Sequence, residues 1–483
     1  MIFNNSNGEE ILRVEPSDSS YRYRSIMGEN ALTLYFSLPG HIELPIGTWC
    51  EFEGEKYTLE LAENFKKHGT QNFEYTVVME SAQAKLKKYK CRDTVEGRLK
   101  FNFMGRPREV IQLIVDNMNR REKGWTVGEC IDMTERLMSF NHAYCFDALT
   151  QAASIFETEF EIDGKKIHFG KVEYNKDTPL PLSYGRGNGF KPGVGRANFE
   201  NSRPVEILFV QGGERNIEWS KYGSRELLLP KEQTIAYDGS KFEDEDMFNE
   251  SMARHYITDD LGLSVMRLDK PLETQAEDSI DLTNIYPKHS GIVTAVEEIP
   301  APTEENPENR FYDFFDTKTI PEELDFSQYI IPGEKATVIF QSGMLAGREF
   351  EIATNSDGDL TGYVHSERRF KLVSQKIDGM DMPNEQYRPK SAADYGDGRE
   401  GDGYAVFNIM LPEAYICNDA DKSGASWTLF REAVRRKYEV EENRFSFTGE
   451  LDGIWSKNDW LNIGGKIRLG SYVDFSDTSK PSN

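Results

Sequence analysis

The feature that most constrains the fold is the period at which apolar residues recur in residues 1–95. Apolar and polar residues alternate from Ala31 to Leu38, and again in Trp49–Phe52, Tyr57–Leu61 and Phe73–Met79. A period of two places successive side chains on opposite faces of a strand. Short sequences rich in proline and glycine separate these runs, as turns do. Residues 1–95 therefore predict a small β-barrel or sandwich domain.

The period changes to that of a helix after Pro107. Apolar residues then recur at helical spacing as far as Met118, and a second helix is predicted over residues 143–156, capped by Ser139 or Asn141. Asp163-Gly164 lies between two short alternating runs, which predicts a β-hairpin. We therefore predict an α+β domain of helices packed on a hairpin over residues 96–200.

The second half of the chain returns to β patterns. Residues 201–284 are predicted as a strand followed by an irregular acidic connector, and Ile299–Asn309, rich in proline and glutamate, as an exposed loop. Residues 285–382 predict a second β-barrel domain. Residues 383–483 predict a helix with its apolar stripe between Trp427 and Tyr438, capped by Ser423 or Ser426, followed by strands.

The two predicted barrels share an order of residue types. In both, a proline–glycine turn precedes a strand that ends at Phe52 or Phe340, and a glycine turn then precedes a strand opened by Tyr57 or Phe350. This order is compatible with duplication and with convergence of simple strand–turn–strand units. The predicted fold class is multidomain α+β and mainly β: two small related β-barrel-like domains flank the α+β domain, and an α+β region ends the chain.

Charge and composition exclude several classes of function. The net charge is −25 at pH 7, and no basic stripe suited to the phosphates of a nucleic acid is visible. The start of the chain lacks the basic and apolar segments of a signal peptide, and no stretch reaches the roughly 20 apolar residues that span a bilayer. The cysteines are odd in number, widely spread and without CxxC, so no disulfide framework or zinc site is predicted; they are Cys50, Cys91, Cys130, Cys145 and Cys417.

Cys145 is the sharpest candidate for catalysis. It lies near a predicted helix start, three residues after His142, and a helix N-terminus lowers the pKa of a thiol. The alternative is a core cysteine on an amphipathic helix, and this is the interpretation that we favour because cysteine is generally buried.

Other motifs lack parts that their chemistry needs. Gly185–Gly189 lacks the Lys-Ser/Thr of a phosphate loop, Asn355–Asp359 lacks the closing glutamate of a calcium loop, and the acidic cluster Asp394–Asp402 resembles a solvated loop. The histidines form no HxH or HExxH motif, and no pair of carboxylates stands out for glycoside cleavage. Trp455 and Trp460 suit carbohydrate binding, but core positions are the preferred interpretation. The sequence thus predicts no catalytic, cofactor-binding or metal-binding residues, and no cofactor.

Several short segments of the sequence resemble segments found in one protein family. They are Met27–Leu32, Leu44–Gly54, Ala148–His168, Gly212–Ile217, Ile285–Pro287, Tyr329–Glu334 and Gly343–Phe350. Together they resemble the tail-associated hub and tail-tip proteins of phages, which include the prophage endopeptidase-tail proteins. The last two segments are similar to those of the Bacteroides-type members. The resemblance covers roughly residues 10–400 and lies in structural segments, not in catalytic motifs.

The resemblance implies a non-enzymatic baseplate hub that closes the distal end of a tail tube or related injection apparatus. It implies a homotrimer whose paired barrels match a sixfold tube. The implied partners are the tail tube or distal tail protein, the tape-measure protein and a C-terminal fibre or spike. Neither stable nucleic-acid binding nor a membrane span is expected. The chain is expected to be made in the bacterial cytoplasm and assembled into the virion tail.

Two other functions stay open at this stage. Many members of the family continue into a fibre or a peptidoglycan-cleaving domain, whereas this sequence ends at Asn483, as a minimal hub or a shortened chain. The first alternative is a tail-associated peptidoglycan hydrolase that uses Cys145 or an acidic pair. The second is a carbohydrate-binding tail module.

Overall fold

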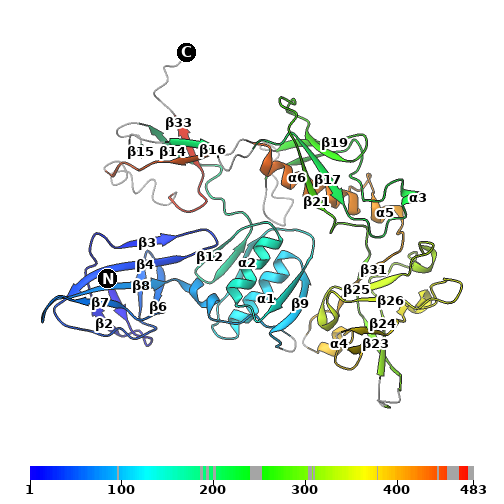
Figure 1. Cartoon of the computed structure of the whole chain (residues 1–483), viewed down its shortest axis with the longest axis horizontal. Coiled ribbons are helices and arrows are strands. Elements are labelled where there is room, and N and C mark those ends of the chain that lie inside the picture. Colours follow the sequence, from blue (N-terminus) through cyan, green and yellow to red (C-terminus); the bar gives the residue numbers. More distant parts are fainter. Residues whose placement is uncertain are drawn as a thin grey trace.

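The computed structural model shows several compact units along the chain (Figure 1). It describes residues 1–94, 97–184, 189–191, 195–198, 203–239, 253–302, 307, 310–377, 379–396, 398–442, 445–453 and 467–476. An N-terminal sheet lies beside a helix-containing unit, and two further β units and a small C-terminal sheet complete the molecule (Figure 1).

The N-terminal unit is an eight-stranded sheet in the order β2-β1-β5-β6-β8-β4-β3, with β7 paired to β8. The predicted alternation is confirmed, since Leu32, Leu34 and Phe36 are buried and the residues between them are not. The sheet path ends at β2 and β3, which do not pair with each other, so the described strands form no closed barrel. The strands are β1 (Ile2–Asn4), β2 (Glu10–Arg13), β3 (Tyr21–Arg24), β4 (Asn30–Leu38), β5 (Trp49–Phe52), β6 (Glu55–Leu59), β7 (Asn64–Lys67) and β8 (Phe73–Glu80).

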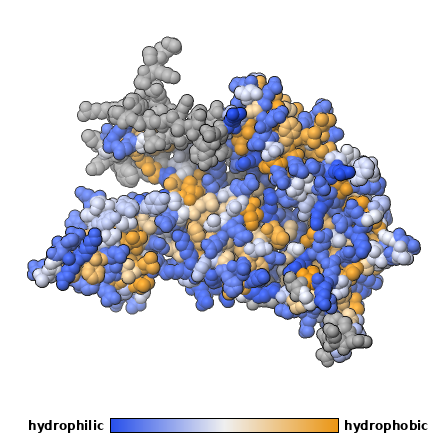
Figure 2. All heavy atoms as spheres, viewed as in Figure 1, coloured by the Kyte–Doolittle hydropathy of each residue, from blue (hydrophilic) through white to orange (hydrophobic). Residues whose placement is uncertain are grey.

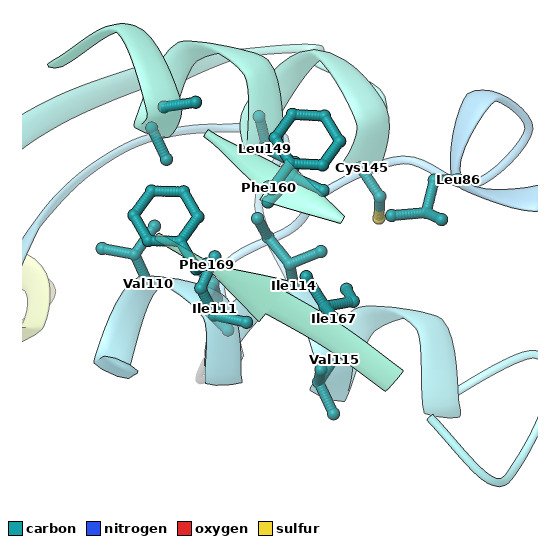
Figure 3. Close-up of a cluster of buried hydrophobic side chains, with 14 of the residues drawn as sticks. Leu86, Val110, Ile111, Ile114, Val115, Cys145, Leu149, Phe160, Ile167 and Phe169 are labelled. Atoms are coloured by element: carbon teal, nitrogen blue, oxygen red, sulfur yellow. The ribbon is translucent and has the colours of Figure 1, made fainter. Parts of the chain in front are cut away.

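The second unit packs two helices against a three-stranded sheet, β10-β13-β12. The predicted hairpin is confirmed: Ile162 pairs with Ile167 across the Asp163-Gly164 turn. Figure 3 shows side chains of both helices and of the hairpin meeting in one apolar cluster. The elements are β9 (Lys100–Gly105), α1 (Pro107–Asn119), β10 (Thr126–Cys130), β11 (Arg136–Asn141), α2 (Cys145–Ile155), β12 (Phe160–Asp163) and β13 (Lys166–Phe169).

The predicted cap of α2 is wrong. Ser139 and Asn141 belong to β11, which pairs with β9, and the N-cap residue is Tyr144. The Asp147 side chain accepts a hydrogen bond from the Tyr144 backbone N–H at 3.2 Å. An acidic residue in the first turn therefore satisfies the start of the helix in place of a Ser or Asn cap.

The third unit is a five-stranded sheet, β18-β19-β20-β17-β21, covered on one face by α6. The expectation of an irregular connector is wrong for the described residues, since four of these strands lie between 234 and 282. The apolar stripe of α6 is confirmed, but its N-cap is Gly424, not Ser423 or Ser426. The elements are β17 (Ile207–Gly212), α3 (Trp219–Tyr222), β18 (Thr234–Tyr237), β19 (Arg254–Thr258), β20 (Ser264–Arg267), β21 (Glu277–Leu282), α5 (Glu413–Ile416) and α6 (Ala425–Val440).

The fourth unit contains two four-stranded sheets, β22-β31-β25-β26 and β23-β24-β28-β27, around one core, with the β29–β30 hairpin beside them. Ile299 and Pro300 lie in β23, so the loop predicted from Ile299 begins later. The elements are β22 (Ser290–Ile292), β23 (Ala295–Pro300), β24 (Arg310–Phe315), β25 (Thr337–Phe340), β26 (Glu349–Glu351), β27 (Tyr363–Val364), β28 (Arg369–Phe370), β29 (Gln375–Ile377), β30 (Met380–Met382), α4 (Ala392–Tyr395) and β31 (Gly403–Phe407).

The two predicted barrels are alike only locally. Cys50 pairs with Tyr57 in one hairpin and Val338 pairs with Phe350 in the other. Around these hairpins the strand orders differ, because one unit is a single sheet and the other is two separate sheets. The prediction of two related barrels is therefore wrong in its strand order, although the mainly β, multidomain fold class is confirmed.

The last strands return to the middle of the sequence. β14 (Leu180–Tyr184) pairs in parallel with β33 (Val473–Ser476) and with β15 (Gly189–Phe190), and β16 (Gly195–Asn198) pairs with β32 (Phe445–Thr448). The C-terminal strands thus share sheets with segments more than 200 residues earlier. No helix among the described residues has both the length and the apolar character needed to cross a lipid bilayer.

Candidate functional site

Cys145 lies in the apolar core of the second unit. Its side chain is fully buried at the first residue of α2, among residues such as Leu86 and Ile114 (Figure 3). Burial raises the pKa of the Cys145 thiol to about 12. His142 is exposed whereas the Cys145 thiol is fully buried, and among the described residues no hydrogen bond joins the two, unlike a nucleophile and its base. A thiol nucleophile works as the thiolate, and this environment opposes its formation.

The acidic cluster Asp394–Asp402 is engaged in local structure. Asp402 is 1% exposed and accepts hydrogen bonds from the Lys390 backbone N–H at 2.8 Å and from the Tyr395 hydroxyl. Burial raises the pKa of Asp402 to about 6, against the lowering effect of these hydrogen bonds. Asp394 caps α4 through Ser391, and Asp397 lies outside the described residues. Asp394 and Asp402 thus hold the chain segment around α4 in place, while Glu400 pairs with Lys318 at 2.8 Å.

The Asn355–Asp359 segment is a closed loop. The Asn355 side-chain oxygen accepts from the backbone N–H groups of Asp357 and Asp359, at 3.0 and 2.8 Å. Its amide nitrogen donates to the Asp359 carboxylate at 2.8 Å. The polar atoms of this loop are thus directed at each other, and the strands on either side of it, β26 and β27, belong to different sheets.

The other sequence candidates bring no site together. Among the described residues, no group of three or more His, Cys, Asp and Glu side chains is arranged to hold a metal ion. Gly185, Gly187, Trp455 and Trp460 lie outside the described residues.

The N-terminal sheet leaves one face open, and large side chains stand on it. Tyr21 pairs with Thr33 and Thr33 pairs with Val78, so these three side chains form a row on the face opposite the core. Tyr21, Tyr23 and Val78 are 52%, 53% and 43% exposed. We call Tyr21, Tyr23, Thr33 and Val78 the N-terminal outer face.

The five-stranded sheet has a similar open face. Val210, Tyr256 and Val265 point toward α6, so their neighbours along the strands point away from it. Ile207 pairs with Met266, and Met266 pairs with Ile257, which gives a second apolar row. We call Ile207, Phe209, Ile257, Met266 and Leu268 the outer face of the five-stranded sheet. Hydrophobic residues are visible on the surface of this unit (Figure 2).

Exposed apolar faces of this kind mark interaction surfaces. Phe209 and Leu268 are 39% and 54% exposed. The sequence carried a signal for both faces that its analysis missed. Ile207–Val210 is a continuous apolar run, and such runs indicate a strand with a cover on both faces. Val78 interrupts the alternation of Phe73–Met79 and puts an apolar side chain on the outer face.

Comparison with known proteins finds neither a protein family nor a curated protein that matches the sequence. Among solved structures, prophage tail protein gp18 from Listeria monocytogenes matches 86% of this chain and 96% of its own chain, with 8% identity and a TM-score of 0.35. The tail protein from Neisseria meningitidis matches 57% of this chain and 99% of its own, with 8% identity and a TM-score of 0.31. The Francisella PdpA-VgrG complex matches 80% and 52%, with 10% identity and a TM-score of 0.22.

Proposed function

We propose that this protein is a non-enzymatic assembly component of a phage tail or related injection apparatus, acting as its hub or tip. The observation that carries the proposal is the pair of open apolar sheet faces, one on the N-terminal unit and one on the five-stranded unit. A strand face with Tyr21 and Tyr23, or with Phe209 and Leu268, is stabilised when a partner removes it from water. The sequence segments that resemble tail hub proteins indicate which assembly this is, a phage tail or related injection apparatus.

The proposed partners follow from the same surfaces. One face serves contacts between copies in a homotrimer, and the other serves the tail tube or distal tail protein. The tape-measure protein and a fibre or spike complete the set of neighbours. The protein is made in the bacterial cytoplasm and assembled into the tail.

Hydrolysis of peptidoglycan is less well supported. The candidate nucleophile, Cys145, is a fully buried thiol whose pKa burial raises to about 12. A cell-wall hydrolase of the cysteine type needs an accessible thiolate beside a base.

Sedimentation velocity tests the assembly proposal. We expect the purified chain to sediment as a trimer. Of the two double variants Phe209→Ser/Leu268→Ser and Tyr21→Ser/Tyr23→Ser, one should sediment as a monomer, which identifies the trimer face, and the other should remain a trimer. The matched control is Val373→Ser/Met380→Ser, which removes two side chains of similar exposure, 37% and 39%, from the fourth unit. The control should remain a trimer.

A wild-type chain that sediments as a dimer, or as a monomer at every concentration, would contradict the proposed homotrimer. Clearing of a peptidoglycan zymogram by the wild type, lost in Cys145→Ala, would replace the assembly function with the hydrolase.

A further inference from the structure

A hollow on the second unit concentrates positive charge in an otherwise acidic protein. It measures about 280 Å³, compared with about 10, 20 and 90 Å³ for three other hollows in the described part of the chain. The volume is near the lower end of the roughly 300–1,000 Å³ typical of ligand pockets. Its charged lining residues are Lys88, Lys90, Arg92, Arg120 and Arg121.

No carboxylate belongs to the described lining of this basic hollow. The chain as a whole has 57 Lys and Arg against 82 Asp and Glu, so five cations gathered around one hollow depart from the composition. Lys88 pairs with Glu60, and Lys90 donates to the His142 carbonyl at 2.6 Å. The described residues provide no ion pair or side-chain hydrogen bond for the guanidinium groups of Arg92 and Arg121, which therefore keep their donors for a ligand.

The walls of the hollow are held in place by neutral hydrogen bonds. Asn117 of α1, only 2% exposed, accepts from the Arg92 backbone N–H at 3.1 Å and donates to the Arg92 carbonyl at 2.8 Å. On the other side, the Cys145 backbone N–H donates to the Tyr89 carbonyl at 2.8 Å. The segment that carries Lys88, Lys90 and Arg92 is thus fixed to both helices, and a fixed site loses less entropy when it binds.

A structural explanation covers only part of this arrangement. Cations near the C-terminus of α1 are favoured by the helix dipole, and this accounts for Arg120 and Arg121. It does not account for Lys90 and Arg92, which come from a different segment, nor for the open volume between the two groups.

We propose that the basic hollow binds a short acidic segment of a neighbouring polypeptide, through two or three of its carboxylates. Guanidinium groups form paired hydrogen bonds with carboxylates, and Arg92 and Arg121 supply two of them. A nucleic acid is a poorer match, because the cations surround one hollow and do not form the stripe that would follow a phosphate backbone. The inference rests on the proposed assembly function, since it names the chemistry of one partner.

Binding of a fluorescein-labelled octaglutamate peptide to the whole chain tests the inference by fluorescence anisotropy. We expect saturable binding that Arg92→Gln/Arg121→Gln weakens by about tenfold or more, as expected for the loss of two charge-assisted contacts. The matched control is Arg203→Gln/Arg225→Gln, which removes the same charge from two exposed arginines elsewhere and should bind like the wild type.

Carbodiimide coupling gives the position of the bound peptide. It joins carboxylates to nearby amines, so we expect coupling to concentrate on Lys88 and Lys90. Coupling spread evenly over the lysines of the chain, or equal loss of binding in both double variants, would overturn the inference. So would tighter binding of pyrophosphate or of a single-stranded DNA oligonucleotide than of the peptide. None of these readouts depends on trimer formation, so failure here is distinct from failure of the assembly proposal.

Discussion

The second and third units build their interiors in different ways. In the second unit, α1, α2 and the hairpin meet through apolar side chains and cysteines, and the buried polar residue among its described helix positions is the neutral Asn117. In the third unit, Lys437 in the last turn of α6 and Glu441 at its C-cap are buried, at 1% and 3% exposed. One interior is held by area removed from water, and the other adds a specific set of charges.

The charges of the third unit form one network. Glu441 accepts hydrogen bonds from Lys437 at 3.0 Å, from Arg254 at 2.6 Å, from Arg267 at 2.9 Å and from the Tyr256 hydroxyl at 2.9 Å. Lys437 also donates to the Val205 carbonyl at 2.8 Å. We call Arg254, Tyr256, Arg267, Lys437 and Glu441 the charge cluster.

The difference shows what each kind of interior specifies. Apolar packing tolerates small shifts of a helix along its groove, whereas the charge cluster requires one position of α6 on β19 and β20. Buried ion pairs add little net stability compared with apolar replacements, but removing one partner leaves the others buried and uncompensated. The third unit should therefore be the more sensitive to a single substitution that removes charge.

The largest effect is expected from Glu441→Gln. This change leaves Lys437, Arg254 and Arg267 without the carboxylate that they share, so unfolding of the third unit should cost about 3–5 kcal/mol less. Hydrogen exchange of residues 425–440 at rising denaturant measures the change. Glu442→Gln is the control, because that side chain is 52% exposed and lies 3.7 Å from Arg254, and its effect should stay within about 0.5 kcal/mol. Equal effects of the two variants would show that burial of the charge cluster does not increase its contribution to the free energy of unfolding.

Leu149→Ala probes the apolar interior of the second unit. Leu149 is fully buried on α2, and its truncation should lower the free energy of unfolding by about 3 kcal/mol through lost burial and a cavity. Hydrogen exchange should accelerate in residues 107–119 and 145–155 while residues 425–440 keep their wild-type rates. Acceleration in all three segments would mean that the two units unfold together, and the comparison drawn between them would not hold.

The sequence predicted the parts of this fold that depend on local patterns. Alternation located β4 and β8, and Asp163-Gly164 located the β12–β13 hairpin, because these patterns reflect which face of a strand is buried. The five-stranded sheet was missed since its cover, α6, comes more than 140 residues after Leu282. Parallel pairing of β17 with β21 leaves no local signature either.

The charge cluster and the basic hollow were missed for a related reason. Glu441 resembles a solvated acid at the end of a helix, and only its partners on the sheet make it a buried group. The cations of the hollow belong to two basic segments, Lys85–Arg92 and Arg120–Lys123, that are about 30 residues apart. Each segment is too short to resemble a nucleic-acid stripe, and only the fold joins them. The Cys145 position, in contrast, followed from its place on an apolar helix.

The pH dependence of stability should differ between the two units. Glu441 is desolvated by burial, but Lys437, Arg254 and the Tyr256 hydroxyl together hold its pKa below the usual value of 4.5. A carboxylate with a lowered pKa in the folded state stabilises the fold above its unfolded pKa, and this contribution is lost as the pH falls through the folded pKa.

The difference in unfolding free energy between wild type and Glu441→Gln should thus have its full size near pH 6 and become smaller below pH 4.5. The gap for Leu149→Ala should not change with pH. Denaturant titrations of the three proteins from pH 7 to pH 3 measure this, and a constant Glu441→Gln gap would refute it.

The smallest effects are expected at the cysteines, and they separate burial from acidity. Burial raises the thiol pKa of both Cys145 and Cys417 to about 12, with a hydrogen bond from Cys417 to Asp419 adding to the shift at that site. At neutral pH the fraction in the thiolate form is thus similarly small for both residues, but Cys145 is fully buried and Cys417 is partly exposed. Iodoacetamide should label Cys417 slowly and Cys145 more slowly still in the folded protein, and both rapidly after denaturation. Cys145→Ala should cost about 1 kcal/mol of stability, as a small core truncation does, and leave assembly unchanged. Peptide mapping by mass spectrometry gives the two labelling rates.

Faster labelling of Cys145 than of Cys417 in the native state would contradict this prediction. It would mean that a reactive thiolate lies where the structure shows an apolar interior, and it would favour peptidoglycan hydrolysis as the function of the second unit.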